Sequence, residues 1–77
     1  MMMDVDFLQY VIKNRGYTVD GFISKLSMSK TTFYKKMNNP KQFTYADIIE
    51  MNDVLKFSAS ESHSIFFSTN GTSMQQN

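Results

Sequence analysis

Residues 27–39, SMSKTTFYKKMNN, concentrate side chains that donate hydrogen bonds to anions. The segment carries three lysines, two threonines and a tyrosine, but no acid. If it is helical, Phe33 and Met37 face inward at i and i+4. The outward positions are then Lys30, Thr31, Tyr34 and Lys35, with Lys36 and Asn38 at the edge. Ammonium and hydroxyl groups donate to phosphate oxygens and to base edges, so this face has the chemistry to bind nucleic acid.

Charge is segregated along the chain, although the net charge of all 77 residues is only +1. All seven acids lie in residues 4–20 or 47–61. The stretch from Gly21 to Ala46 holds five lysines and no acid. A basic middle between acidic ends is typical of nucleic-acid binding, and a solvated lysine face is the alternative interpretation.

Capping residues and apolar periodicity predict five helices around these side chains. The first is expected from about Val5 to Arg15, with Asp4 as its N-cap and a left-handed Gly16 after its end. The other four are expected to begin after hydroxyl N-caps, at Thr18, Ser29, Thr44 and Ser58. Ser58 and Glu61 have the spacing of a capping box, and the three caps before them are flanked by hydrophobic-staple pairs.

These elements predict an all-α fold: a compact five-helix domain over residues 1–67, followed by a flexible polar tail at 68–77. The three methionines at the start are expected to be a frayed end. Only Ser27, Met28 and Ser29 are expected to separate the second helix, with Leu26 on its inner face, from the third. Such a short turn between two short helices is typical of a helix-turn-helix, in which the second helix enters the major groove.

The stretch TVDGFISKLSMSKTTFYKKMNN, residues 18–39, resembles the helix-turn-helix of lambda-repressor-like (Cro or XRE-type) regulators, of the small phage and prophage kind. The similarity continues through FTYADIIEMNDVLKFSASESHSIFF, so it covers about residues 5–67. Three positions depart from the family: Val19 stands where a phosphate-binding glutamine is common, Ile23 replaces a packed alanine, and Ser27 replaces the glycine of the turn. Ser27 is therefore expected in a conformation that glycine enters more cheaply.

The resemblance implies a sequence-specific DNA-binding regulator and gives individual residues their roles. Base reading falls on Lys30, Thr31 and Lys35. Phosphate contacts are expected from Thr18 at the start of the second helix, and from Tyr34, Lys36, Asn38, Asn39 and Lys41. Two plainer interpretations stay open: Lys36 only solubilises the surface, and Asn38-Asn39-Pro40 only ends the helix.

Double-stranded operator DNA is the expected partner, bound by a homodimer, because one recognition helix makes few base contacts. The candidate dimer residues are Phe57, Ile65, Phe66 and Phe67. The opposing interpretation is that the last phenylalanines close the core. An alternative function is a protein-interaction module on the same fold, such as an antirepressor or adaptor.

Other classes of function lack support in the residues. There is no cysteine, so neither a disulfide nor a thiolate metal site is expected, and His63 has no second histidine with which to form a metal site. Asp47, Glu50 and Asp53 are spaced for one helix face, interpreted as solvated surface or a dimer rim rather than a catalytic carboxylate pair. We expect no enzyme, cofactor, metal or small-molecule ligand. The acidic start and the lack of a long apolar run predict a cytoplasmic protein without signal peptide or membrane span.

Overall fold

The computed structural model describes residues 3–66, which form five α-helices and one short 3-10 helix. The elements are α1 (Val5–Asn14), α2 (Val19–Ile23), α3 (Lys30–Asn38), η1 (Pro40–Gln42), α4 (Tyr45–Leu55) and α5 (Ala59–Phe66). No strand occurs in this part of the chain, so the all-α prediction is confirmed for residues 3–66. Phe67 and the predicted tail at 68–77 lie outside the described residues.

The predicted helix starts are confirmed by their caps. The N-cap side chains of Asp4, Thr18, Ser29 and Thr44 each accept a hydrogen bond from the backbone N–H three residues further on. At α5, the Glu61 N–H donates to Ser58 Oγ at 3.1 Å and the Ser58 N–H donates to Glu61 Oε1 at 2.9 Å. Each cap satisfies an N–H that has no partner within its helix, which is why these starts follow from local sequence.

Two of the helices, α1 and α4, are followed by a left-handed residue, and one of these two residues was predicted. Gly16 has a φ of +89° and follows Arg15, the C-cap of α1, as expected from its position. Lys56 ends α4 with a φ of +54° and is the one non-glycine residue with positive φ between residues 3 and 66. The expectation of a glycine-like conformation at Ser27 was therefore wrong.

α2 is shorter than predicted, and the connection to α3 is correspondingly longer. The helix ends at Ile23, so residues 24–29 separate it from α3 instead of the expected 27–29. The Ser24 Oγ donates to the Gly21 carbonyl at 2.6 Å, and Leu26 N–H donates to the Ile23 carbonyl at 2.9 Å. The Leu26 bond is a tighter i to i+3 backbone bond, which continues the chain as a turn after the α-helix has ended, while the Ser24 hydroxyl gives the Gly21 carbonyl a side-chain partner.

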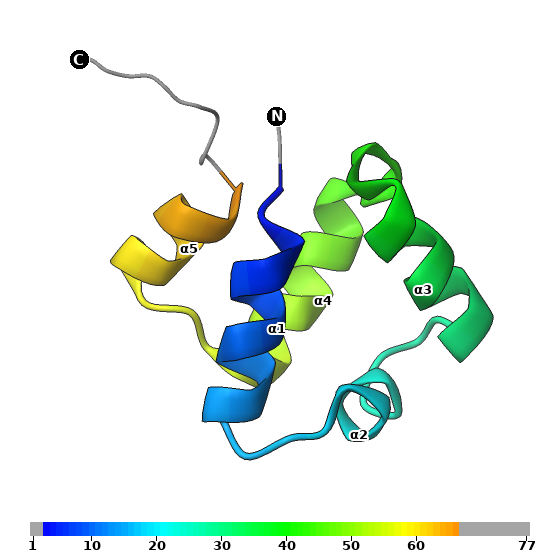
Figure 1. Cartoon of the computed structure of the whole chain (residues 1–77), viewed down its shortest axis with the longest axis horizontal. Helices are drawn as coiled ribbons and strands as arrows, with labels where there is room; N and C mark the ends of the chain where they lie inside the picture. Colours follow the sequence, from blue (N-terminus) through cyan, green and yellow to red (C-terminus); the bar gives the residue numbers. More distant parts are fainter. Residues whose placement is uncertain (1–2, 67–77) are drawn as a thin grey trace.

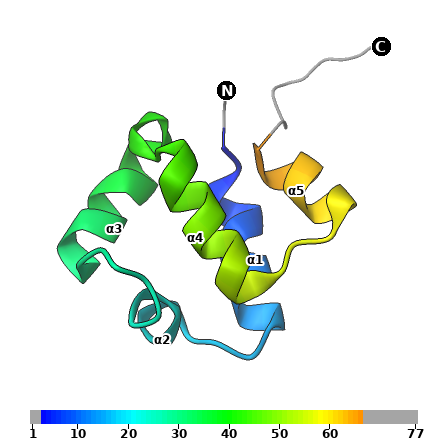
Figure 2. The same cartoon turned by 180° about the vertical axis from the view of Figure 1, so that it is seen from behind.

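α1 lies in front of α4 in the middle of the view in Figure 1 and behind it in Figure 2, with α5 on one side, α3 on the other and α2 across the lower end. The largest fully buried side chains are Leu8, Val11, Ile12, Phe22, Phe33, Met51, Leu55 and Ile65. Phe33 lies at the centre of an aromatic cluster, in edge contact with Phe22 at 6.0 Å and Phe43 at 5.9 Å between ring centroids. This cluster anchors α3 to α2 and to the segment before α4.

The start of the described chain is held in place rather than frayed. Met3 is buried in the core, and the Asp4 N–H donates to the Ile65 carbonyl of α5 at 2.7 Å. The prediction of a frayed end was therefore wrong for Met3. No helix within residues 3–66 combines the length and hydrophobicity needed to span a bilayer.

Arg15 joins the end of α1 to the end of α4 and the start of α5. Its Nε donates to the Leu55 carbonyl at 2.9 Å and its Nη2 to the Lys56 carbonyl at 3.3 Å. Its guanidinium group also forms an ion pair with Glu61, the residue that completes the α5 capping box. The hydrogen bonds from Arg15, and then that from the Ser58 N–H, lower the pKa of Glu61 to about 2.

Candidate nucleic-acid interface

α3 has one buried face and one exposed face, divided as the sequence predicts. Phe33 and Met37 are buried in the core. Lys30, Thr31, Tyr34 and Lys35 are exposed on the other side of the helix. Ser29 starts the helix, since its Oγ accepts from the Thr32 N–H at 3.1 Å, and the same hydroxyl donates to Thr32 Oγ1 at 3.0 Å. Thr32 is thus used to hold the start of α3, and the exposed face consists of cationic and hydroxyl side chains without an acid.

A carboxylate from α2 lies beside this exposed face. Asp20 accepts a hydrogen bond from Lys30 Nζ at 3.2 Å through one oxygen and from Tyr34 Oη at 3.1 Å through the other. The bond from Lys30, and then that from Tyr34, lowers the pKa of Asp20. Desolvation, and then the bond to Asp20, raises the pKa of Tyr34. Two of the predicted DNA-contacting side chains are therefore already paired within the protein.

Lys36 lies against α4 instead of projecting toward a ligand. Its Nζ is 2.5 Å from Asp47 Oδ2, and the side chains of this ion pair are only 18% and 15% exposed. The prediction of a phosphate contact at Lys36 is therefore corrected, because the ammonium group is used to join α3 to α4. The alternative interpretation, in which Lys36 only solubilises the surface, is also wrong, because its side chain is largely buried.

Asp47 holds two groups at once, so its prediction as solvated surface or dimer rim was wrong. Besides Lys36, it accepts from the Thr44 N–H at 2.9 Å, while its own N–H donates to Thr44 Oγ1 at 3.1 Å. The two bonds make a capping box at the start of α4. Burial raises the pKa of Asp47, but the bonds from Lys36 and Thr44 lower it by more. The Thr44-x-x-Asp47 spacing was a sequence signal for this box.

Glu50, the second acid on α4, caps the turn between α2 and α3. Its carboxylate accepts from the Ser27 N–H at 2.6 Å and from Ser27 Oγ at 3.1 Å. Glu50 was predicted as surface, and no local pattern in the sequence indicated this contact. Asp20, Asp47 and Glu50 thus all fold back onto the stretch that contains no acid in the sequence.

The remaining phosphate candidates differ in how available they are. Thr18 uses its hydroxyl oxygen as the cap of α2, next to the acid Asp20. Asn38 is the exposed last residue of α3. Asn39 ends that helix, with its N–H bonded to the carbonyls of Lys35 and Lys36, so the helix-ending interpretation of this run is confirmed for its backbone.

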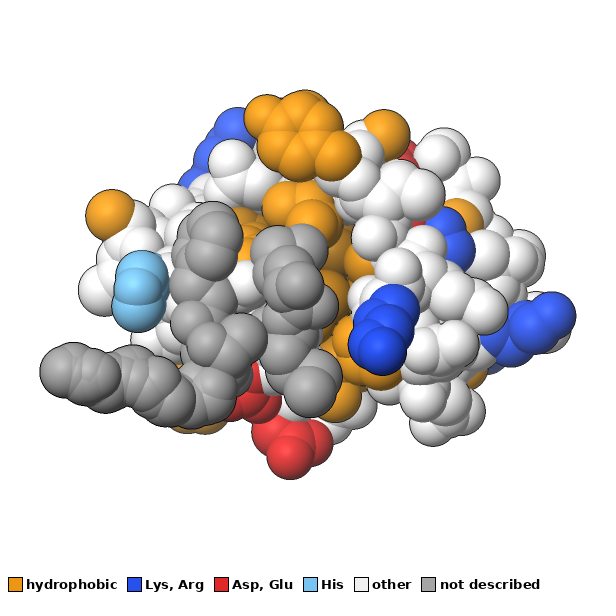
Figure 3. Space-filling view, turned by 90° about the horizontal axis from the view of Figure 1, so that it is seen from above, with side chains coloured by type: hydrophobic (Ala, Val, Ile, Leu, Met, Phe, Trp, Pro, Cys, Tyr) orange, Lys and Arg blue, Asp and Glu red, His pale blue; other side chains and the backbone are white. Residues whose placement is uncertain are grey.

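Lysines without a carboxylate partner lie near α3. None of the three ion pairs found in residues 3–66 includes Lys25, Lys35 or Lys41, and all three side chains are exposed. Lys41 belongs to η1, directly after α3. Figure 3 shows cationic side chains toward the α3 side of the upper face, beside a band of hydrophobic side chains.

Two of the four hydrophobic dimer candidates belong to the core. Ile65 and Phe66 are buried, so Ile65 has no surface to offer a partner and the prediction for it is corrected. Phe66 stacks edge-on against the half-buried Phe57, with 5.6 Å between ring centroids. For Phe66 the core-closing interpretation holds, and Phe67 lies outside the described residues.

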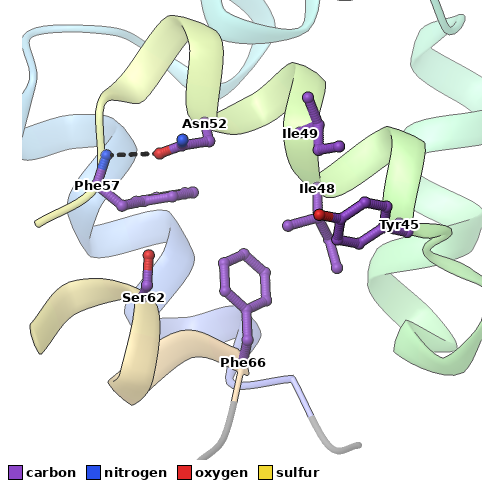
Figure 4. A pocket seen from close by; sticks show the side chains of 7 residues that line it. All are labelled: Tyr45, Ile48, Ile49, Asn52, Phe57, Ser62 and Phe66. Atoms are coloured by element: carbon purple, nitrogen blue, oxygen red, sulfur yellow. Dashed lines mark hydrogen bonds between the residues drawn. The ribbon is translucent and has the colours of Figure 1, made fainter. Parts of the chain in front are cut away.

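An apolar groove of about 320 Å³ lies between α4 and α5 (Figure 4). It is lined by Tyr45, Ile48, Ile49, Asn52, Phe57, Ser62 and Phe66. Tyr45 and Ile49 are 78% and 45% exposed and so are two of the four large hydrophobic side chains exposed in the described part of the chain. Sequence periodicity identified Ile48 as inward-facing but did not show that α5 leaves this side of α4 open.

Searches against protein-family models, curated proteins and solved structures found no match to this chain. No group of three or more potential metal ligands occurs among residues 3–66. The function must therefore be inferred from the surface chemistry of α3 and its surroundings.

Proposed function

We propose that the protein is a sequence-specific DNA-binding transcriptional regulator with a lambda-repressor-like fold, which inserts α3 into the major groove of its operator. The observation that carries this proposal is the exposed face of α3. It presents Lys30, Thr31, Tyr34 and Lys35 on a helix that is anchored from behind by Phe33 and Met37.

The size and chemistry of α3 support a major-groove role. An α-helix with its side chains is about 10–12 Å across, which the roughly 12 Å width of the major groove admits, and the nine residues of α3 extend for about 13 Å. Thr31 and Lys35 are four residues apart and share one side of the helix. Lysine donates to the O6 and N7 atoms of guanine, and threonine either forms a hydrogen bond or meets a thymine methyl. We assign base reading to these two residues. Lys30, the third predicted base reader, is paired with Asp20 and is assigned a phosphate contact instead.

Phosphate binding is assigned to exposed side chains around the two ends of α3. Lys30 lies at its N-terminal end, and Asn38 and Lys41 lie at its C-terminal end. Lys30 and Tyr34 become available once they leave Asp20. Lys36 is removed from this set because Asp47 holds it against α4. The affinity therefore rests on fewer cations than the five lysines of the sequence suggest, which strengthens the case for two recognition helices in a dimer.

We place the contact with a second copy of the chain at the groove between α4 and α5. Tyr45 and Ile49 protrude beside a concave apolar surface on the same helix pair, so one patch offers both a projection and a recess. A two-fold interface uses the same patch on both subunits and requires such self-complementarity. Phe57 is the predicted dimer residue that lines this groove and remains partly exposed.

Selection of bound duplexes from a random pool tests DNA binding, sequence preference and half-site spacing together. We expect enrichment of a pseudo-palindrome whose half-sites are about one helical turn apart. Lys35→Ala should then weaken binding to the enriched duplex about 10-fold or more, because it removes a base contact. Lys13→Ala, which removes an exposed lysine from α1, is the matched control and should change affinity little.

Far-UV circular dichroism should show that both variants keep the helical signal of the wild type. Affinity should also fall steeply with salt, since phosphate contacts release counterions. Weak binding without enrichment of any sequence would refute the regulator proposal, and so would equal losses in Lys35→Ala and Lys13→Ala.

A protein-interaction module on the same fold is the second candidate. Two lysines of the basic stretch, Lys30 and Lys36, are paired with carboxylates, and this favours a role other than DNA binding. One stoichiometric protein partner, bound by a chain that fails the duplex selection, would favour this alternative.

A further inference from the structure

The acid beside the exposed face of α3 has a geometry that links it to two ligand-binding side chains at once. Lys30 and Tyr34 are four residues apart on α3, and Asp20 reaches both from the first turn of α2. Each carboxylate oxygen accepts one bond, so Lys30 and Tyr34 bind separate oxygens of Asp20. The side chains of Asp20 and Lys30 are 59% and 61% exposed, which leaves the pair open to exchange with an incoming ligand.

The pair adds little to folding, because exposed ion pairs are screened by water and salt. Its effect on a ligand is larger. A phosphate that approaches Lys30 or Tyr34 meets a negative charge within hydrogen-bond distance of both, and must displace it to gain their donors. The lowered pKa of Asp20 means that this carboxylate stays ionised at neutral pH.

We propose that Asp20 determines specificity by competing with DNA phosphate for Lys30 and Tyr34, an inference that rests on the proposed DNA-binding function. Non-specific binding depends almost wholly on phosphate contacts, so the competing carboxylate weakens it strongly. At an operator, the base contacts of Thr31 and Lys35 do not involve Asp20 and offset the cost of displacing it. The carboxylate therefore lowers affinity for every duplex but raises the ratio of specific to non-specific affinity.

The test compares Asp20→Asn with wild type on two duplexes: the one enriched by selection and a scrambled one of equal length and composition. We expect the variant to bind the scrambled duplex about threefold to tenfold more tightly at low salt, and the enriched duplex by a smaller factor. The logarithmic salt slope on the scrambled duplex should steepen by about one phosphate's contribution, roughly 0.9. In a Lys30→Met background, the gain on the scrambled duplex should shrink.

Asp53→Asn is the matched control, since it removes an exposed acid from the last turn of α4, where a negative charge does not favour the helix. It changes the net charge by the same amount and should leave the affinity ratio unchanged. Asp20→Ser provides a second variant with the same expected result, and thermal melts check that both Asp20 variants fold.

If Asp20→Asn tightens both duplexes by one common factor, as a change in net charge alone would, the inference is overturned while the regulator proposal stands. If the wild type binds the duplexes without preference, the regulator proposal fails and the inference fails with it. An undiminished gain in the Lys30→Met background would overturn the assigned route through Lys30.

Discussion

The ion pair between Lys36 and Asp47 should be a main support of the position of α3. Asp47→Ala removes a charge-assisted hydrogen bond to Lys36, worth about 1.5–3 kcal/mol, and the capping bond to the Thr44 N–H, worth about 1 kcal/mol. Because the two side chains are 18% and 15% exposed, water replaces little of the lost interaction. We expect a loss of about 3 kcal/mol in the free energy of unfolding, a large part of the total for a chain of this size.

Asp47→Asn separates the two contributions. It keeps an oxygen that can accept from Thr44 but removes the charge that holds Lys36, so we expect a smaller loss of about 2 kcal/mol. Urea denaturation followed by far-UV circular dichroism measures both variants. In a double-mutant cycle with Lys36→Met, the Lys36–Asp47 coupling energy should be about 1–2 kcal/mol.

The pair of Lys30 and Asp20 is the built-in control for this cycle. It joins the same two residue types, but both side chains are more than half exposed, so Lys30→Met with Asp20→Asn should show no measurable coupling in stability. A Lys36–Asp47 coupling energy that is also indistinguishable from zero would refute the view that this pair fixes α3 against α4.

Two further predictions concern the helix ends. The hydrogen bonds from Arg15, and then that from the Ser58 N–H, lower the pKa of Glu61 from 4.5 to about 2, so they should stabilise the fold above about pH 4.5 and lose this effect as the pH falls toward 2. Glu61→Gln should flatten that part of a plot of urea midpoint against pH, and an unchanged slope would contradict this prediction. Lys56→Gly should raise stability by about 1 kcal/mol, because glycine adopts the left-handed conformation of this position without steric cost. Lys13→Gly, inside α1, should lower stability by about the same amount. Thermal melts in which both variants lose stability would contradict this prediction.

The helix starts could be predicted because an N-cap and its N–H donor lie three residues apart in the same chain segment. Asp4 and Ser58 are examples of such N-caps. The burial of Phe33 and Met37 could also be predicted, because it follows from their periodicity on α3. Helix ends were less predictable. The left-handed position after α4 is occupied by Lys56 and not by a glycine, so the sequence did not indicate it. α2 ends where the Ser24 hydroxyl donates to the Gly21 carbonyl, a bond that the sequence pattern also did not indicate.

The charge pattern was misleading for a physical reason. Ion pairs form in space, and the partners that matter here are 10 or 11 residues apart: Asp20 with Lys30 and Asp47 with Lys36. Glu50 reaches Ser27 across 23 residues. A stretch without acids in the sequence therefore becomes a surface with three acids along its borders. No local pattern gives these distances, because they depend on how α2 and α4 pack against α3.

The pairings with Asp20 and Asp47 give the lysines of α3 different roles. Lys36 is lost as a phosphate contact, but its bond to Asp47 fixes the position of α3, whose other face is proposed to read bases. A base-reading side chain held within fractions of an ångström discriminates between bases better than a loosely held one. Lys35 lies one residue away, is exposed and takes part in none of the ion pairs within residues 3–66. Loss of Lys36 should therefore act on DNA binding through the orientation of α3, and loss of Lys35 through direct contact. Under the proposed function, the charge that α3 offers to DNA is set by which carboxylates fold back onto α3, and not by the number of lysines in the segment.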